Sequence, residues 1–71
     1  MNLYIVETRN FDFKCFAEDD VQFKVFMTKA WTKHCQEYGI KFDQEFLNEI
    51  TEYPNTLEVK SGVYRDNQFL K

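Results

Sequence analysis

Three side chains carry the sulfur and imidazole groups that could do chemistry: Cys15, His34 and Cys35. A nucleophilic cysteine needs a base within hydrogen-bonding distance. His34 and Cys35 are neighbours on a predicted helix, where successive side chains diverge by about 100°, so these two do not form a dyad. Cys15 lies on a different predicted element, so a contact between Cys15 and His34 across the core is geometrically allowed. A lone histidine on the apolar side of a helix is more often a packed residue, so we expect His34 to be buried with one ring nitrogen satisfied.

The sequence contains no recognisable metal or phosphate motif. A structural zinc site takes four ligands, and these three side chains have no familiar ligand spacing. Neither GxxxxGK[ST] nor GxGxxG occurs among the two glycines, and no GxSxG is present. We therefore expect no catalytic residue, no metal, no cofactor and no enzymatic activity.

The cysteine usage predicts a compartment. Two cysteines without a CxxC neighbour do not form a disulfide framework, although a single Cys15–Cys35 bridge stays open. The first residues have no basic region before a long apolar run, and no stretch approaches the roughly 20 apolar residues of a membrane span. The expectation is a cytoplasmic protein with reduced thiols and no membrane contact.

Acidic side chains gather on the second predicted helix, which has no Lys or Arg between positions 42 and 59. Glu45, Glu49 and Glu52 follow the i, i+4, i+7 spacing of one helix face, with Asp43 at its start. Like charges at this spacing destabilise a helix by a few tenths of a kcal/mol per pair. The row is either a solvated face or a surface that steers a basic partner towards the protein. One form of the second interpretation is DNA mimicry, for which the carboxylates are few.

Other candidate contact residues are apolar or basic. Tyr53 and Tyr64 are predicted to supply contact area to a protein partner, because aromatic anchors dominate such interfaces. Val21 and Val25 lie on the polar side of the first predicted helix, where they either pack under a loop or contact a second copy in a homodimer. Exposed strand edges at 11–17 or 68–70 offer another route to strand pairing.

A basic patch provides the alternative function. The exposed part of the first predicted helix carries Lys24, Lys29 and Lys33, which together with Arg9 and Lys14 would form a local basic patch. Nucleic-acid binding depends on a basic field. The chain has twelve acidic and nine basic side chains and a net charge of −3, so nucleic acid is the less favoured partner.

The elements that position these residues follow from periodicity and capping. Apolar groups on both faces of 2–8 predict a central strand covered on both sides, and 11–17 alternate as a half-buried strand. The first helix runs from an N-cap at Asp19, with Gln22 completing a capping box, to a left-handed stop at Gly39. Its apolar arc comprises Phe23, Met27, Ala30, Trp31, His34 and Tyr38.

The second helix starts at Asp43 and ends at Pro54. Its apolar stripe comprises Phe46, Leu47, Ile50 and Tyr53.

The residues after Pro54 are predicted to form short extended segments. Strands are predicted at 56–60, 63–65 and 68–70, with turns or a bulge at Ser61–Gly62 and Asp66–Asn67. The 71 residues include eight Phe, four Tyr and one Trp, enough for an aromatic core in a single domain spanning 1–71. The predicted class is α+β, a small antiparallel sheet of three to four strands with two helices on one face, in the order ββααβ(β).

Together these patterns favour a non-enzymatic module that binds another protein. In being short, acidic and aromatic without a catalytic set, the chain is similar in type to accessory proteins that viruses or mobile elements use to bind and inhibit host proteins. That similarity involves no motif. The partner is expected to present a basic surface.

Overall fold

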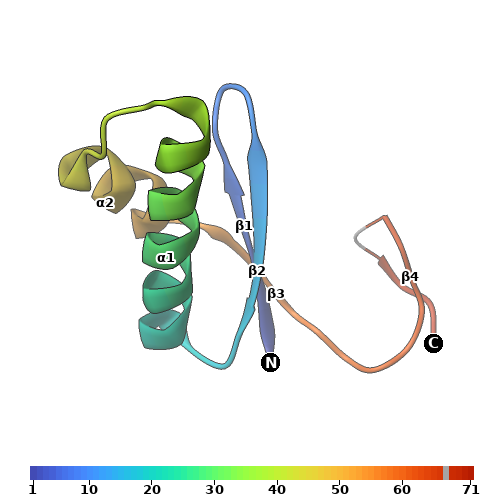
Figure 1. Ribbon diagram of the computed structural model, residues 1–71. Coiled ribbons are helices and arrows are strands. Elements are labelled where there is room, and N and C mark those ends of the chain that lie inside the picture. The colour runs from blue at the N-terminus through green and yellow to red at the C-terminus, as the bar shows by residue number, and fades with distance from the viewer. Residues whose placement is uncertain (67) are drawn as a thin grey trace.

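The computed structural model describes residues 1–66 and 68–71 and has the predicted α+β order (Figure 1). Its elements are β1 (Asn2–Glu7), β2 (Asp12–Ala17), α1 (Asp20–Tyr38), α2 (Gln44–Glu52), β3 (Asn55–Glu58), β4 (Tyr64–Arg65) and β5 (Gln68–Phe69). Within the described ranges, neither helix is long and apolar enough to cross a membrane.

The main sheet has three antiparallel strands in the order β2-β1-β3, so β1 is the central strand, as predicted. In the register, Tyr4 lies opposite Cys15 on one side and Thr56 on the other. The last two strands pair only with each other, as a separate hairpin. The sheet therefore has three strands, the lower of the two numbers expected.

Helices cover one face of this sheet: α1 packs on β2, and α2 reaches β1 (Figure 1). Tyr4 and Val6 point to that face and are buried, whereas the alternate residues Leu3 and Ile5 are only half-buried. The expectation that both faces of β1 are covered is wrong. Two short helices in one layer can shield only one side of a sheet.

Helix α1 begins and ends at the predicted caps. The Asp19 carboxylate accepts a hydrogen bond from the Gln22 backbone N–H at 2.8 Å, and Gln22 Oε1 accepts from the Glu18 N–H rather than from that of Asp19. Gly39 is left-handed with φ 64°, and its N–H bonds the carbonyl oxygen of Cys35. These contacts satisfy backbone groups that a helix end otherwise leaves without partners.

The buried face of α1 is rotated relative to the predicted arc. Phe23, Met27, Trp31 and His34 are buried as expected, but Ala30 and Tyr38 are exposed and Cys35 is buried. Helix α2 packs against the Cys35 edge of the arc and leaves the Ala30 edge uncovered, whereas Tyr38 is the last residue of α1.

Helix α2 starts at its predicted N-cap, where the Asp43 carboxylate accepts from the backbone N–H groups of Glu45 and Phe46. Leu47 and Thr51 form its buried side. The Thr51 hydroxyl donates to the Leu47 carbonyl at 2.8 Å, which explains how a polar side chain is accommodated there. Tyr53 was predicted on the apolar stripe; instead it lies just past the helix end and is 89% exposed.

The core consists of two clusters of buried side chains. The first joins the sheet to the start of α1 and contains Tyr4, Val6, Ala17, Phe23 and Met27. The second joins α1 to α2 and contains Trp31, Cys35 and Leu47. Half-buried Phe13 and Ile50 touch both clusters. The rings of Tyr4 and Phe23 stack with centroids 4.3 Å apart.

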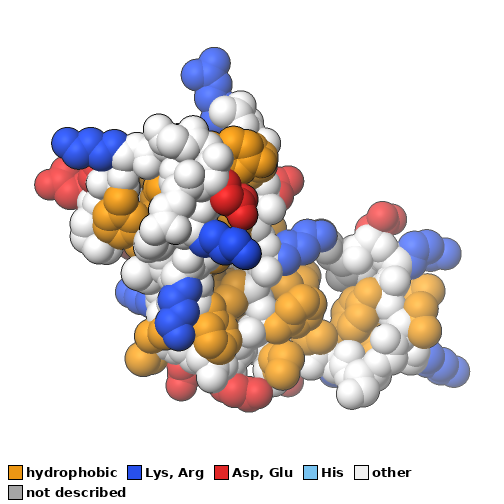
Figure 2. Space-filling model, viewed as in Figure 1, with side chains coloured by type: hydrophobic (Ala, Val, Ile, Leu, Met, Phe, Trp, Pro, Cys, Tyr) orange, Lys and Arg blue, Asp and Glu red, His pale blue; other side chains and the backbone are white. Residues whose placement is uncertain are grey.

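Residues 60–66 and 68–71 form an arm that carries the β4–β5 hairpin and stands apart from the sheet (Figures 1 and 2). Gly62 has φ 144°, and a Cβ there would lie 2.6 Å from the carbonyl carbon of Lys71, so only glycine fits. Of the predicted Asp66–Asn67 turn, Asp66 is left-handed with φ 55°, and Asn67 lies outside the described residues. The Cα radius of gyration is 13.2 Å, against about 11 Å for a compact chain of this length.

The Tyr4 hydroxyl generates a prediction about alkaline stability. It donates to Asp20 Oδ1 at 2.8 Å while the ring is only 1% exposed. Burial, and then this hydrogen bond to a carboxylate, raise the pKa of Tyr4. We expect Tyr4→Phe to lower the free energy of unfolding at pH 7, because it removes the donor to Asp20.

Because the folded pKa lies above the unfolded one, the contribution of Tyr4 is complete below about pH 10 and is lost as pH rises through the folded pKa. The wild-type protein should therefore lose stability above pH 10 more steeply than Tyr4→Phe, as measured by urea denaturation from pH 7 to 11. Tyr53→Phe, at an exposed position, is the control and should keep the wild-type slope. Equal slopes for all three proteins would contradict this account.

Candidate binding surfaces

The two cysteines lie in different parts of the core, and both are free thiols. Cys15 faces a hollow beside Phe26, Met27 and Ala30, and Cys35 belongs to the cluster between the helices. Burial raises the pKa of the Cys15 thiol, which lowers its thiolate fraction at neutral pH. The Cys15–Cys35 bridge that the sequence left open is not formed. Within the described residues, no three His, Cys, Asp or Glu side chains are grouped to hold a metal ion.

His34 is buried, as expected, at 8% exposure. Four rings surround its imidazole: Phe11, Phe13, Trp31 and Tyr38, with centroid distances of 4.7, 5.4, 5.0 and 4.8 Å. The expected satisfied nitrogen is not found, since no side-chain hydrogen bond of residues 1–66 and 68–71 uses this imidazole. The ring is held by its aromatic neighbours: Trp31 stacks on it, and Phe11 and Phe13 meet it edge-on.

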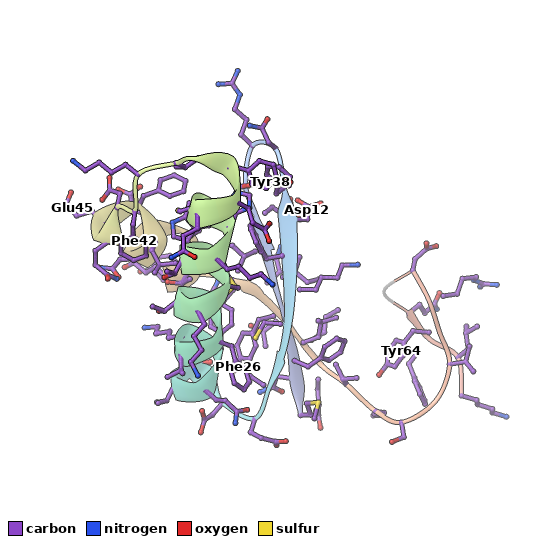
Figure 3. All side chains as sticks on the ribbon, in the orientation of Figure 1. Asp12, Phe26, Tyr38, Phe42, Glu45 and Tyr64 are labelled. Atoms are coloured by element: carbon purple, nitrogen blue, oxygen red, sulfur yellow. The ribbon has the colours of Figure 1, made fainter. Side chains whose placement is uncertain are left out.

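A pocket of about 320 Å³ opens beside His34, between the β1–β2 turn and the α1–α2 loop. In Figure 3, the labelled Tyr38 and Phe42 mark the two ends of this loop. The pocket is lined by Thr8, Arg9, Asn10, Phe11, Trp31, His34, Ile40, Asp43 and Phe46. No motif in the sequence marks this pocket, because its walls come from four separate segments. The aromatic content of those segments was the one available signal.

The glutamates of α2 are exposed along the whole length of the helix. Glu45, Glu49 and Glu52 lie opposite the buried Leu47 and Thr51. In the described part of the chain the one ion pair joins the N-terminal ammonium to Glu18, so these three carboxylates have no cationic partner there. We call Glu45, Glu49 and Glu52 the acidic row. Asp43 differs from them, because its carboxylate caps the helix.

The structure separates the two tyrosines that were predicted to join this row. Tyr53 directly follows α2 and lies beside the acidic row in the chain. Tyr64 lies on the arm, and Figure 3 shows it at the opposite end of the molecule from Glu45. Its hydroxyl accepts a hydrogen bond from the Lys60 N–H at 2.6 Å, and its ring packs on Phe69. The predicted contact set therefore spans two surfaces.

The uncovered face of the sheet is a second candidate surface. The register places Phe16, Leu3 and Leu57 side by side across β2, β1 and β3. Phe16 is 54% exposed, and Leu57 is also exposed. Tyr64 from the arm faces this row across a groove of about 210 Å³, seen in Figure 2 as hydrophobic side chains on both sides of a hollow. We call Leu3, Phe16 and Leu57 the open-face row.

The remaining candidates lie on the exposed side of α1. Val21 is 74% exposed and Val25 is also exposed. Lys24, Val25, Thr28 and Lys29 line a shallow hollow there, and Lys33 is exposed further along the helix. Contact with a second copy through the valines stays a prediction, as does nucleic-acid binding through the three lysines.

Compared with known proteins, the chain matches no family model, no curated protein and no solved structure.

The environment of Cys15 predicts slow thiol chemistry. In a Cys35→Ser background, we expect iodoacetamide to modify Cys15 at pH 8 about tenfold more slowly in the folded protein than in urea, because the thiol is half-buried and its pKa is raised. The folded rate should continue to rise with pH above the range where an exposed thiol levels off. Mass spectrometry gives both rates, and a folded rate that exceeds the unfolded one would show an activated cysteine.

Proposed function

We propose that this protein is a non-enzymatic module that binds another protein through the uncovered face of its sheet. The observation that carries the proposal is the open-face row, which places three apolar side chains in line across the three strands. Exposed apolar patches of this kind mark interaction sites in small soluble proteins. The arm provides a second wall, with Tyr64 opposite the row.

The exposed area supports the same proposal. A compact monomer of 8.6 kDa exposes about 4,700 Å², whereas this structure exposes 5686 Å². The difference of roughly 1,000 Å² is comparable with the 800 Å² that each partner contributes to a standard protein interface. A partner seated between the sheet and the arm would remove much of this extra surface from water.

In this proposal the acidic row steers the approach of the partner protein. It lies on the outer side of α2, and α2 covers the opposite face of the sheet from the open-face row. Its field therefore orients the approach of a basic partner more than it contributes contact energy. The partner would present an apolar contact surface with basic residues around it, and binding in the cytoplasm would inhibit or modulate that protein. A net charge of −3 makes nucleic acid a weaker candidate for Lys24, Lys29 and Lys33.

Substitution of Phe16 tests the contact surface. We expect Phe16→Asp to weaken partner binding at least tenfold, because it places a charge in the middle of the apolar patch. Loss of an interface anchor typically costs about 2 kcal/mol of binding free energy. The measurement is affinity capture from native host extract with mass spectrometry, followed by titration of the purified partner. Val21→Asp is the matched control, since it adds the same charge at an exposed valine on α1. If both variants capture the same proteins as the wild type, the open-face row is not the contact surface.

Neutralising the acidic row tests the steering. We expect replacement of Glu45, Glu49 and Glu52 by Gln to slow association with the captured partner and to flatten the salt dependence of the rate, with little change in dissociation. Stopped-flow or biosensor kinetics across a salt series give both quantities.

The control for this experiment removes the same net charge elsewhere, by replacing the exposed Glu7, Glu37 and Glu58 with Gln. Equal slowing in both triple variants would show that overall charge matters and the position of the acidic row does not. Unchanged kinetics in the first variant would remove the row from the mechanism.

A further inference from the structure

The pocket beside His34 contains polar groups that the fold leaves without partners. Trp31 is 6% exposed, and its Nε1–H is buried with no hydrogen-bond acceptor among the described residues. His34 is more than nine-tenths buried, lines the same pocket and makes no side-chain hydrogen bond to any residue that the structure describes. Buried polar groups in folded proteins are almost always paired. Trp31 Nε1 is thus the one buried unpaired side-chain atom among the described residues, and the His34 imidazole, whose nitrogens solvent reaches, is the polar group of this wall that a ligand can pair with.

The walls of the pocket are suited to a flat ring. Phe46 tilts against Trp31 with centroids 5.4 Å apart, and Phe11 meets His34 edge-on at 4.7 Å. Aromatic rings prefer stacked or edge-to-face neighbours at these separations. A volume of about 320 Å³ accommodates one such ring, and the exposed Phe11 and Phe46 leave the entrance open to solvent.

The charges at the entrance select a neutral ligand. Arg9 and Asp43 both line the pocket and carry opposite charges, so the lining has no net charge that would favour a cation or an anion. What remains is an uncharged ring carrying one hydrogen-bonding group that can pair with the imidazole.

We propose that this pocket binds the side chain of a tyrosine or tryptophan from a partner protein, with its O–H or N–H group paired to His34. The proposal rests on the protein-binding function proposed above, and it adds a second contact at the end of the molecule formed by the β1–β2 turn and the α1–α2 loop. A shallow pocket open at one side suits a ring that enters from another protein surface, because the backbone that carries the ring stays outside.

The test uses p-cresol and indole as side-chain probes, with the full chain observed by proton NMR. The sequence contains one histidine and one tryptophan, so both reporter signals are unambiguous. We expect saturable shifts of the His34 ring protons and the Trp31 indole N–H at millimolar probe. Toluene, which fills the same volume as p-cresol without the hydroxyl, should bind about five- to tenfold more weakly, the loss expected for one hydrogen bond.

Two variants locate the binding. Phe46→Ala removes an exposed wall of the pocket and should weaken p-cresol binding at least fivefold, whereas Phe16→Ala removes an exposed ring on the other side of the sheet and should leave it unchanged. N-acetyltyrosine amide should bind as p-cresol does. Binding of p-cresol without binding of the amide would show a site for free small aromatics and would overturn the proposed source.

Three further results would overturn the proposal. The first is the absence of saturable shifts up to the solubility of p-cresol and indole. The second is toluene binding as tightly as p-cresol. The third is tetramethylammonium binding more tightly than p-cresol and toluene. Each of them leaves the Phe16→Asp experiment unaffected, because that substitution lies on the uncovered face of the sheet. Conversely, if Phe16→Asp retains every partner while p-cresol still saturates the His34 signals, the open-face proposal fails and the pocket remains.

Discussion

The structure depends on the position of β1 between two partner strands beneath a single layer of helices. Its backbone is paired with β2 along Asn2–Glu7 and with β3 along Asn2–Ile5, which places the strand in the middle of the sheet. Tyr4 and Val6 then anchor the helices, and Leu3 and Ile5 are left on a face that nothing in the described chain covers fully. A small domain gains a core on one side in this way and retains an apolar surface on the other.

Aromatic rings take over much of the packing that aliphatic side chains supply in larger domains. The Tyr4–Phe23 stack fixes the start of α1 on the sheet, and the rings around His34 fix its end. Rings provide large contact areas at few positions. Those with polar atoms, such as Trp31, also bring donors into the interior that the short chain does not pair. The candidate pocket is a direct result of building the core from such residues.

Features encoded by a few neighbouring residues could be predicted from the sequence. The caps at Asp19, Gly39 and Asp43 depend on local hydrogen bonds, and all three are found. The side of α1 that is buried depends on where α2 packs, and for this reason Cys35, not Ala30, faces the core. The uncovered face of β1 and the pocket beside His34 depend on segments far apart in the chain. Apolar periodicity identifies the side chains that need cover but not the surface that covers them.

The division of the core into two clusters affects how the folded protein opens. Trp31, Cys35 and Leu47 hold α2 in place, and among the described residues Phe13 and Ile50 are the half-buried side chains that touch both this cluster and the cluster on the sheet. Such a narrow link makes the two halves weakly cooperative, so α2 can detach while the strands stay paired. Amide protons of α2 should then exchange with solvent by local opening, at a lower free energy than those of β1. A partner that holds the α2 end closed would slow this exchange without touching the sheet.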